Sequence, residues 1–279
     1  SRLIALSQWS GKASALNRAW EYCKGEIVVV SDADTPLERS SIRKIVRNFA
    51  DPTVGAASGM QTVVGGDSPS ATMLEKNYRG IFEILRLGES NMDSTPIFNG
   101  PISAFRRDLL DKIDPDSQAD DIELCVKTRE KGYRAVYDPE AIAYVQVPTG
   151  LKNSIRQKSR RARGVIQSFI RHRGMLFNIR YGKYGFVIFP CEFFMHVISP
   201  TLLALAVILG IVNMVLDPNM AMSLLMAGAI LLLVSASVLM ASKTKINPIA
   251  VLATFLSHQI FLILGLVPIL MKKTGYKWE

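Results

Sequence analysis

Cysteine is scarce in this sequence. The 279 residues include three cysteines, at positions 23, 125 and 191, which lie far apart along the chain. This spacing provides neither the paired framework of a disulfide-stabilised protein nor the clustered ligands of a zinc site. We therefore expect three reduced cysteines that serve as packing residues.

Acidic residues are absent from one long stretch. No Asp or Glu occurs between Ala141 and Cys191, whereas Lys and Arg are frequent there, and the formal net charge of the chain is +9. An uncompensated positive stretch favours anionic partners, namely diphosphates, lipid headgroups or nucleic acid. Because an apolar segment follows immediately, we favour the first two partners and expect no nucleic acid.

The N-terminus lacks a secretory signal peptide, and the first residue is Ser1 rather than Met. Residues 11–20, 27–32, 37–49 and 54–64 alternate in pattern between helix and strand, which predicts an α/β domain with a mainly parallel sheet and flanking helices. The alternation starts without an opening strand. We therefore expect that the N-terminal part of the domain is missing from this sequence.

Two carboxylates follow a run of β-branched residues. Val28, Val29 and Val30 predict a strand that is buried on both faces, and Asp32 and Asp34 come directly after it. The carboxyl end of such a strand is where α/β proteins bind ligands, and paired carboxylates suit Mg²⁺ or Mn²⁺ that carries a diphosphate. A polar cap between strand and loop is the alternative for so short a motif.

Further charged candidate site residues lie at the starts of two predicted helices. Lys12 lies in the first turn of the helix at 11–20, where an anion is favoured, although a solvated lysine is equally compatible with this stretch. Asp120 and Asp121 open another helix, where acids ordinarily complement the helix dipole. Because a polar loop precedes them at the same expected sheet edge, we interpret Asp121 as a candidate general base.

The helix predicted over residues 151–171 has a basic face. At 100° per residue, Gln157, Arg160, Arg161 and Gly164 fall opposite the apolar side chains of the same helix. A solvated surface is the alternative. Glutamine and arginine donors in this arrangement suit a diphosphate and sugar hydroxyls.

Long apolar runs dominate the C-terminal part. Residues 186–216, 220–241 and 246–271 each exceed the length of about 20 residues that crosses a hydrocarbon core, so we predict transmembrane helices over 186–271, with a tail at 272–279. Residues 171–185 are predicted to lie as an amphipathic segment at the membrane interface. His258 and Gln259 fall inside the third run, where an inter-helix hydrogen bond is the favoured role.

These segments predict an integral, multi-pass membrane protein with a cytoplasmic catalytic domain. The topology of the third span stays open, because Lys272, Lys273 and Lys277 would end on the outer side.

The ordered motifs together resemble the membrane-anchored family 2 glycosyltransferases, which include cellulose and hyaluronan synthases and dolichyl-phosphate sugar synthases. The resemblance spans roughly residues 11–164 and rests on an ordered set of short motifs: Gly11-Lys12-x-x-Ala15-Leu16-Asn17, Asp32-x-Asp34, Asn99-Gly100 through Arg106-Arg107, Asp120-Asp121 and Gln157-x-x-Arg160-Arg161. Each motif is weak alone.

This resemblance implies a GT-A glycosyltransferase domain over residues 1–170 that performs an inverting transfer from a UDP- or GDP-sugar. It implies a Mn²⁺ or Mg²⁺ site at Asp34 and Asp32, nucleotide contacts from Lys12 and Asp32, and donor contacts from Gln157, Arg160 and Arg161. Asp121 would be the base, with Asp120 as the first substitute.

One position departs from the family pattern. Arg161 stands where the family has a tryptophan next to the acceptor. A guanidinium pairs with phosphate rather than stacking under a sugar ring. We therefore expect a lipid phosphate as the acceptor, with a growing glycan, as in a processive polysaccharide synthase, as the alternative. A membrane-tethered nucleotide-sugar sensor and a transporter are the hypotheses from other classes.

Overall fold

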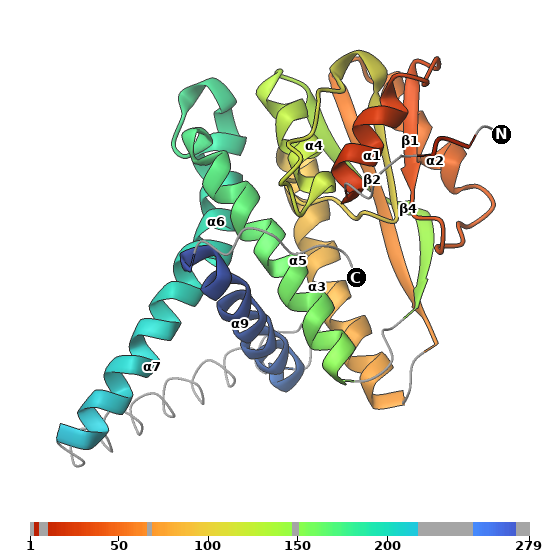
Figure 1. The fold of residues 1–279 in the computed structure, drawn as a ribbon. Coiled ribbons are helices and arrows are strands. Elements are labelled where there is room, and N and C mark those ends of the chain that lie inside the picture. The colour runs from red at the N-terminus through yellow and green to blue at the C-terminus, as the bar shows by residue number, and fades with distance from the viewer. Residues whose placement is uncertain (1–2, 6–10, 66–68, 147–150, 217–247, 272–279) are drawn as a thin grey trace.

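A computed structural model describes residues 3–5, 11–65, 69–146, 151–216 and 248–271 of the chain (Figure 1). Its principal elements, in chain order, are α1 (Gly11–Trp20), β1 (Ile27–Ser31), α2 (Ser41–Arg47), β2 (Val54–Val64), α3 (Pro69–Met92), β3 (Ile102–Arg106), α4 (Asp120–Glu130), β4 (Arg134–Gln146), α5 (Leu151–Arg171), α6 (Phe189–Phe193), α7 (Ser199–Leu216) and α9 (Pro248–Leu270). The α/β class with flanking helices is confirmed. The predicted helix at 37–49 is shorter than expected, because its α-helical part begins at Ser41.

The sheet is mixed, with the strand order β1-β3-β2-β4. β2 pairs with β4 in parallel, whereas β3 runs antiparallel to both of its neighbours, so the prediction of a mainly parallel sheet is right for β2–β4 and wrong for the two pairs that β3 makes. Ser31 at the end of β1 lies opposite Ile102 at the start of β3. The reversal therefore brings the turn before β3 to the same edge as Asp32.

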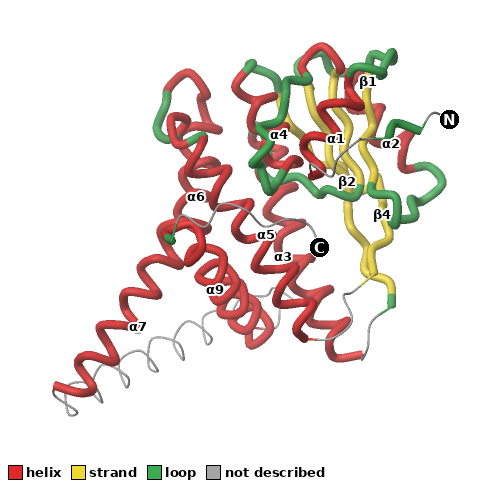
Figure 2. Tube along the Cα trace, in the orientation of Figure 1, coloured by secondary structure: helices red, strands yellow, loops and turns green. Residues whose placement is uncertain are grey.

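Helices cover both faces of the sheet. Ile27 and Val29 of β1 join a cluster with Ile45 of α2 on one face, while Val30 packs on the other face with residues of α1 and α4. Both faces of β1 are thus covered, but Val28 is the buried residue of the strand, while Ile27, Val29 and Val30 are half-buried, so the prediction of a strand buried on both faces is confirmed in part. In Figure 2 the longer strands β2 and β4 extend beyond the rest of the sheet as a two-stranded ribbon.

A second core joins the sheet domain to the C-terminal helices. Ile122 of α4, Phe169 of α5 and Phe189 of α6 are buried in one cluster together with Tyr184. α5 therefore lies between the sheet domain and the apolar helices, as Figure 1 shows.

One helix among the described residues is long and apolar enough to cross a membrane, Tyr184–Leu216, which contains α6 and α7. Its first half packs on the domain, whereas large apolar side chains of its second half are more than half exposed, including Leu202, Val207, Ile208, Leu209, Ile211, Met214, Val215 and Leu216. In Figure 1 this half projects away from the domain. The predicted span at 220–241 lies outside the described residues.

α9 lies alongside α5 and corresponds to the third apolar run. Leu262 and Leu266 are buried against Ala162 and Ile166 of α5. Gln259 is fully buried, and its side-chain amide makes no hydrogen bond with the described residues, so the inter-helix hydrogen bond predicted for Gln259 is absent from that part of the chain. The ring of His258 instead contacts the ring of Phe82.

Candidate active site

The site begins at the carboxyl end of β1. Lys12, in the first turn of α1, places its Nζ atom 3.1 Å from Asp32 Oδ1 and 3.3 Å from Asp120 Oδ2. Burial alone would lower the pKa of Lys12, but the charges of Asp120, Asp32 and Asp121 outweigh it and raise that pKa above its usual value. Lys12 is therefore a permanent cation that holds two separate acidic motifs together.

Gly100 marks the point where these motifs meet. A Cβ atom at Gly100 would lie 3.4 Å from Asp121 Oδ2 and 3.9 Å from both Asp32 Oδ2 and Lys12 Nζ. Because glycine leaves that volume open, a ligand can approach an ammonium and two carboxylates from the backbone of this turn. Four sequence motifs, which span residues 12 to 121, thus surround one small space.

The two acids that open α4 differ in their surroundings. Burial is the main cause of the raised pKa of Asp120. The neighbouring charge of Asp121 raises this pKa further, while Lys12 opposes the shift. Asp121 accepts a hydrogen bond from the backbone N–H of Ile122 through Oδ1, at 3.0 Å, which leaves Oδ2 toward Gly100. Asp120 is thus engaged with Lys12, whereas Asp121 offers an oxygen to the open space.

Asp34 lies two residues after Asp32 and is exposed. Its Oδ1 accepts a hydrogen bond from Thr35 Oγ1 at 3.3 Å. Among the described residues, no three His, Cys, Asp or Glu side chains form a complete metal site. Exposed Asp34 beside Asp32 nevertheless fits a Mg²⁺ or Mn²⁺ ion that takes one or two carboxylates from the protein and its remaining ligands from phosphates and water.

α5 supplies the basic side of the site. Arg160 is partly buried, and burial is the main cause that lowers its pKa. The positive charges of Arg156 and Arg161 lower this pKa as well, whereas the charges of Asp120 and Asp32 raise it. Arg160 therefore lies within electrostatic range of the acids at the sheet edge. Gln157 and Arg161 are exposed on the same helix. The structure thus brings Arg160 to the acidic motifs and leaves Gln157 and Arg161 on the solvent side.

Gly164 explains how closely α5 approaches the acids. A Cβ atom there would lie 2.9 Å from both Ala119 Cβ and the Gln118 carbonyl oxygen. These atoms precede Asp120 directly. The glycine that interrupts the basic face is therefore a packing contact between α5 and the loop that carries the acids.

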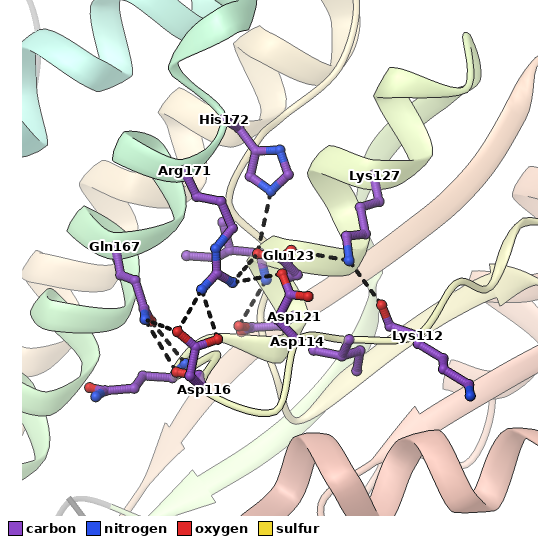
Figure 3. Close-up of polar contacts among 12 residues, drawn as sticks. Lys112, Asp114, Asp116, Asp121, Glu123, Lys127, Gln167, Arg171 and His172 are labelled. Atoms are coloured by element: carbon purple, nitrogen blue, oxygen red, sulfur yellow. Dashed lines mark hydrogen bonds and ion pairs between the residues drawn. The ribbon is translucent and has the colours of Figure 1, made fainter. Parts of the chain in front are cut away.

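A buried ionic cluster fastens α4 to α5 one turn beyond the acids (Figure 3). Glu123 is fully buried and pairs with Arg171 Nη1 and His172 Nε2, both at 3.3 Å, and with Lys127 Nζ at 3.2 Å. Burial would raise the pKa of Glu123, but the hydrogen bond and charge of His172 and the charges of Lys127 and Arg171 lower it to about 2. Burial likewise lowers the pKa of His172, but Glu123 and Glu130 outweigh it and raise that pKa to about 9.

The same end of α5 also holds the loop before α4. Arg171 Nη2 donates to both carboxylate oxygens of Asp116, at 2.9 and 3.0 Å, and the side chain of Gln167 accepts from the Gln118 backbone N–H at 3.2 Å. Figure 3 shows Gln167 and Arg171 pointing from α5 toward this loop. The position of Asp120 and Asp121 is therefore set by α5 as well as by α4.

The sequence pattern missed this clamp. Nothing local indicates that Glu123 pairs with Arg171 and His172, which lie 48 and 49 residues further along the chain. An arginine and a histidine side by side at a helix end were the available signal.

Comparison with known proteins now assigns the family. The family model described as glycosyl transferase family group 2 matches residues 27–233, which is most of the chain. The chain belongs to glycosyl transferase family group 2. The resemblance drawn from the short motifs is confirmed at the level of the family.

Two curated relatives are named after N-acetylglucosamine. An N-acetylglucosaminyltransferase of Rhizobium sp. (strain N33) is 28% identical over 230 residues, which are 78% of this chain and 50% of that protein. A poly-β-1,6-N-acetyl-D-glucosamine synthase of Staphylococcus aureus (strain COL) is 25% identical over 165 residues, which are 58% of this chain and 40% of that protein. The chain thus spans half or less of the length of these curated relatives.

A solved glycosyltransferase shares the fold. The mannosyltransferase PcManGT from Pyrobaculum calidifontis, determined in complex with GDP-Man and Mn²⁺, aligns with a TM-score of 0.73 and 30% identity, over 98% of this chain and 70% of that one. The prediction of a GT-A-type glycosyltransferase fold is therefore confirmed.

Proposed function

We propose that this chain is the catalytic part of a metal-dependent, inverting glycosyltransferase that moves one sugar from a nucleotide sugar to a lipid phosphate such as a polyprenyl phosphate. The convergence of Lys12, Asp32 and Asp121 on the space at Gly100 is the observation that carries this proposal. A donor diphosphate needs compensating positive charge, and an attacking oxygen needs a base, and both chemistries are available around one space.

The donor side consists of the carboxylates after β1 and the basic face of α5. A Mn²⁺ or Mg²⁺ ion at Asp34 and Asp32 would offset the charge that develops on the leaving diphosphate. PcManGT, whose structure contains Mn²⁺ and GDP-Man, supports a divalent metal and a nucleotide-sugar donor. Gln157 and Arg160 bind the diphosphate oxygens, and Lys12 contacts the nucleotide side.

Asp121 takes the acceptor proton. Its Oδ2 faces the space at Gly100, and its Oδ1 is fixed by the Ile122 N–H. An acceptor hydroxyl, or the P–OH of a monoanionic phosphate, attacks the anomeric carbon, its proton passes to Asp121, and the bond to the nucleoside diphosphate breaks. Asp120 is the weaker candidate for this role because its carboxylate is paired with Lys12.

The basic face of α5 favours an anionic acceptor. Arg156, Arg160 and Arg161 lie close enough for their charges to interact, and the sequence contains no acid between Ala141 and Cys191. A bound phosphate relieves repulsion among the guanidinium groups and accepts bidentate hydrogen bonds from them. Arg161 is exposed, so an acceptor can reach its side chain.

The long apolar helix favours an acceptor that resides in lipid. The exposed apolar half of the helix Tyr184–Leu216 has the composition of a span. We propose that residues 1–170 form the cytoplasmic catalytic domain, that residues 171–185 lie at the interface, and that residues 186–271 belong to a multi-pass membrane part.

A growing polysaccharide is the second candidate acceptor. The S. aureus relative is named as a poly-β-1,6-N-acetyl-D-glucosamine synthase, which favours repeated transfer. A non-catalytic sensor is the third hypothesis, but a sensor has no use for the carboxylate of Asp121.

The test is product analysis. Membranes that contain the full-length protein are incubated with Mn²⁺, polyprenyl phosphate and each of a panel of radiolabelled UDP- and GDP-sugars, beside membranes with a Lys12→Met variant. Label in a chloroform-soluble lipid that carries one sugar supports the proposal, and the variant should lose it. A ladder or a high-molecular-weight product identifies the polysaccharide alternative, whereas nucleotide-sugar binding without any transfer identifies the sensor.

A further inference from the structure

Asn99, the residue before Gly100, is a buried and hydrogen-bonded polar residue. It is 1% exposed. Its Nδ2 donates to the Gly59 carbonyl oxygen at 2.8 Å, its backbone N–H donates to Ser58 Oγ at 2.8 Å, and its Oδ1 accepts from Arg86 Nη1 at 2.6 Å. Two anchors come from β2 and the third from α3. Each of these contacts fixes the chain at the residue that precedes Gly100.

The position of Gly100 matters because the site is built around it. The chain must place Gly100 so that a Cβ atom there would lie 3.4 Å from Asp121 Oδ2 and 3.9 Å from Asp32 Oδ2, and glycine has no side chain to hold it there. Pro101 follows, and it has no backbone N–H to bond. The anchoring of this turn therefore depends on Asn99 and on its partners.

Arg86 is a charged partner of Asn99. Its charge interacts with the buried carboxyl groups of Glu89 and Glu192. Glu89 is held by Thr95 Oγ1 at 2.8 Å, and Glu192 lies on α6, which leads toward α7. The guanidinium of Arg86 is partly buried, and its hydrogen bond to Asn99 Oδ1, at 2.6 Å, is charge-assisted and therefore stronger than a bond between neutral groups.

We propose that Arg86 and Asn99 are positioning residues for sugar transfer, because together they hold the Gly100 turn against Asp121 and Asp32. Neither residue needs to touch the substrates. Because this inference rests on the proposed transfer, its test includes one readout that does not require activity.

Three variants separate positioning from general stability. Arg86→Gln removes the charge and shortens the donor, and Arg86→Lys keeps the charge. Arg79→Gln is the matched control, since Arg79 lies two turns earlier in α3 and donates to the side chain of Gln61 on β2 rather than to Asn99. Asn99→Asp is isosteric and places a carboxylate oxygen against the Gly59 carbonyl, so it serves as a second variant if Arg86→Gln does not accumulate.

Amide hydrogen exchange measured by mass spectrometry is the first readout. Arg86→Gln and Asn99→Asp should speed exchange in peptides that cover residues 97–103, whereas Arg79→Gln should leave those peptides unchanged. Unchanged exchange in both variants would overturn the inference, whether or not any transfer is detected.

Steady-state kinetics with the donor identified by product analysis is the second readout. Misplacing reacting groups by about 1 Å can cost about 10²-fold in rate. Arg86→Gln should therefore lower kcat by about 10- to 100-fold with the donor KM within about threefold. Arg86→Lys should recover much of that loss. A wild-type protein that transfers no sugar refutes the proposed function, while an active wild type with an unaffected Arg86→Gln variant refutes the positioning role.

Discussion

Replacing Gly164 with alanine tests how tightly α5 must pack against the acid-bearing loop. The new Cβ atom would lie 2.9 Å from Ala119 Cβ and from the Gln118 carbonyl oxygen, and 3.0 Å from the Gln118 carbonyl carbon. Carbon atoms in contact normally lie about 3.5 to 4.0 Å apart. Two of the three neighbours are backbone atoms that cannot swing aside, so helix and loop must separate.

The Gly164→Ala substitution has two opposing effects on the free energy of unfolding. Alanine in place of glycine inside a helix stabilises it by about 0.5 to 1 kcal/mol. Overpacking a tight contact costs about 1 to 3 kcal/mol. The matched control is Gly88→Ala in α3, because a Cβ atom at Gly88 would meet no atom within 4 Å. The difference between the two variants therefore isolates the overlap, at about 1 to 3 kcal/mol.

Thermal unfolding of the detergent-solubilised protein measures this difference. Each kcal/mol corresponds to about 2 to 4 °C in Tm for a domain of this size, so Gly164→Ala should melt below Gly88→Ala by several degrees. Transfer activity should fall as well, by up to about 10²-fold, because Arg160 lies one turn before Gly164 and moves with it. A Gly164→Ala variant that is as stable and as active as Gly88→Ala would refute the packing argument.

Three further perturbations probe the metal, the central space and the clamp. Asp34→Ala should abolish the Mn²⁺ dependence of nucleotide binding in calorimetry, and wild-type affinity that is unchanged by EDTA would remove the metal assignment. Gly100→Ala should keep its Tm, since its Cβ would meet atoms at ordinary contact distances of 3.4 and 3.9 Å, yet lose transfer because the methyl group fills the space beside Asp121. The pKa of His172 is raised from its usual 6.5 to about 9, so its contribution to stability is complete below pH 6.5 and disappears as the pH rises through about 9. His172→Gln should therefore lower the Tm more at pH 6 than at pH 10, and an equal loss at both values would contradict the ionic role.

Local patterns predicted the elements that carry the site. The valine run before Asp32 identified a strand, and its side chains contact helices on both faces, although Val29 and Val30 are only half-buried. The helix predicted over residues 151–171 has the same bounds in the structure. These features could be predicted because neighbouring residues alone determine the period of buried positions and the end of a strand.

Local sequence patterns did not predict contacts between segments that are far apart in the chain. The motif from Asn99-Gly100 through Arg106-Arg107 gave no indication that β3 returns antiparallel between β1 and β2, because strand direction depends on the path of the preceding helix. Glu123 gave no sign that its charge would be buried against α5. α9 is apolar, but its Gly265 lets it lie against the backbone of α5, where a Cβ atom would come within 2.8 Å of the Arg163 nitrogen.

Asp121→Asn tests most directly the central claim that this space performs acid–base chemistry on a bound donor. The substitution keeps the shape of the side chain and removes the base, which is worth about 10²- to 10⁴-fold in rate. An Asp108→Asn variant, which alters an exposed acid, serves as the control. Binding of the nucleotide sugar to Asp121→Asn should stay within a few fold of the wild type, while its turnover in a single-turnover assay collapses and that of Asp108→Asn does not. Turnover that survives in Asp121→Asn would contradict the account and place the base elsewhere.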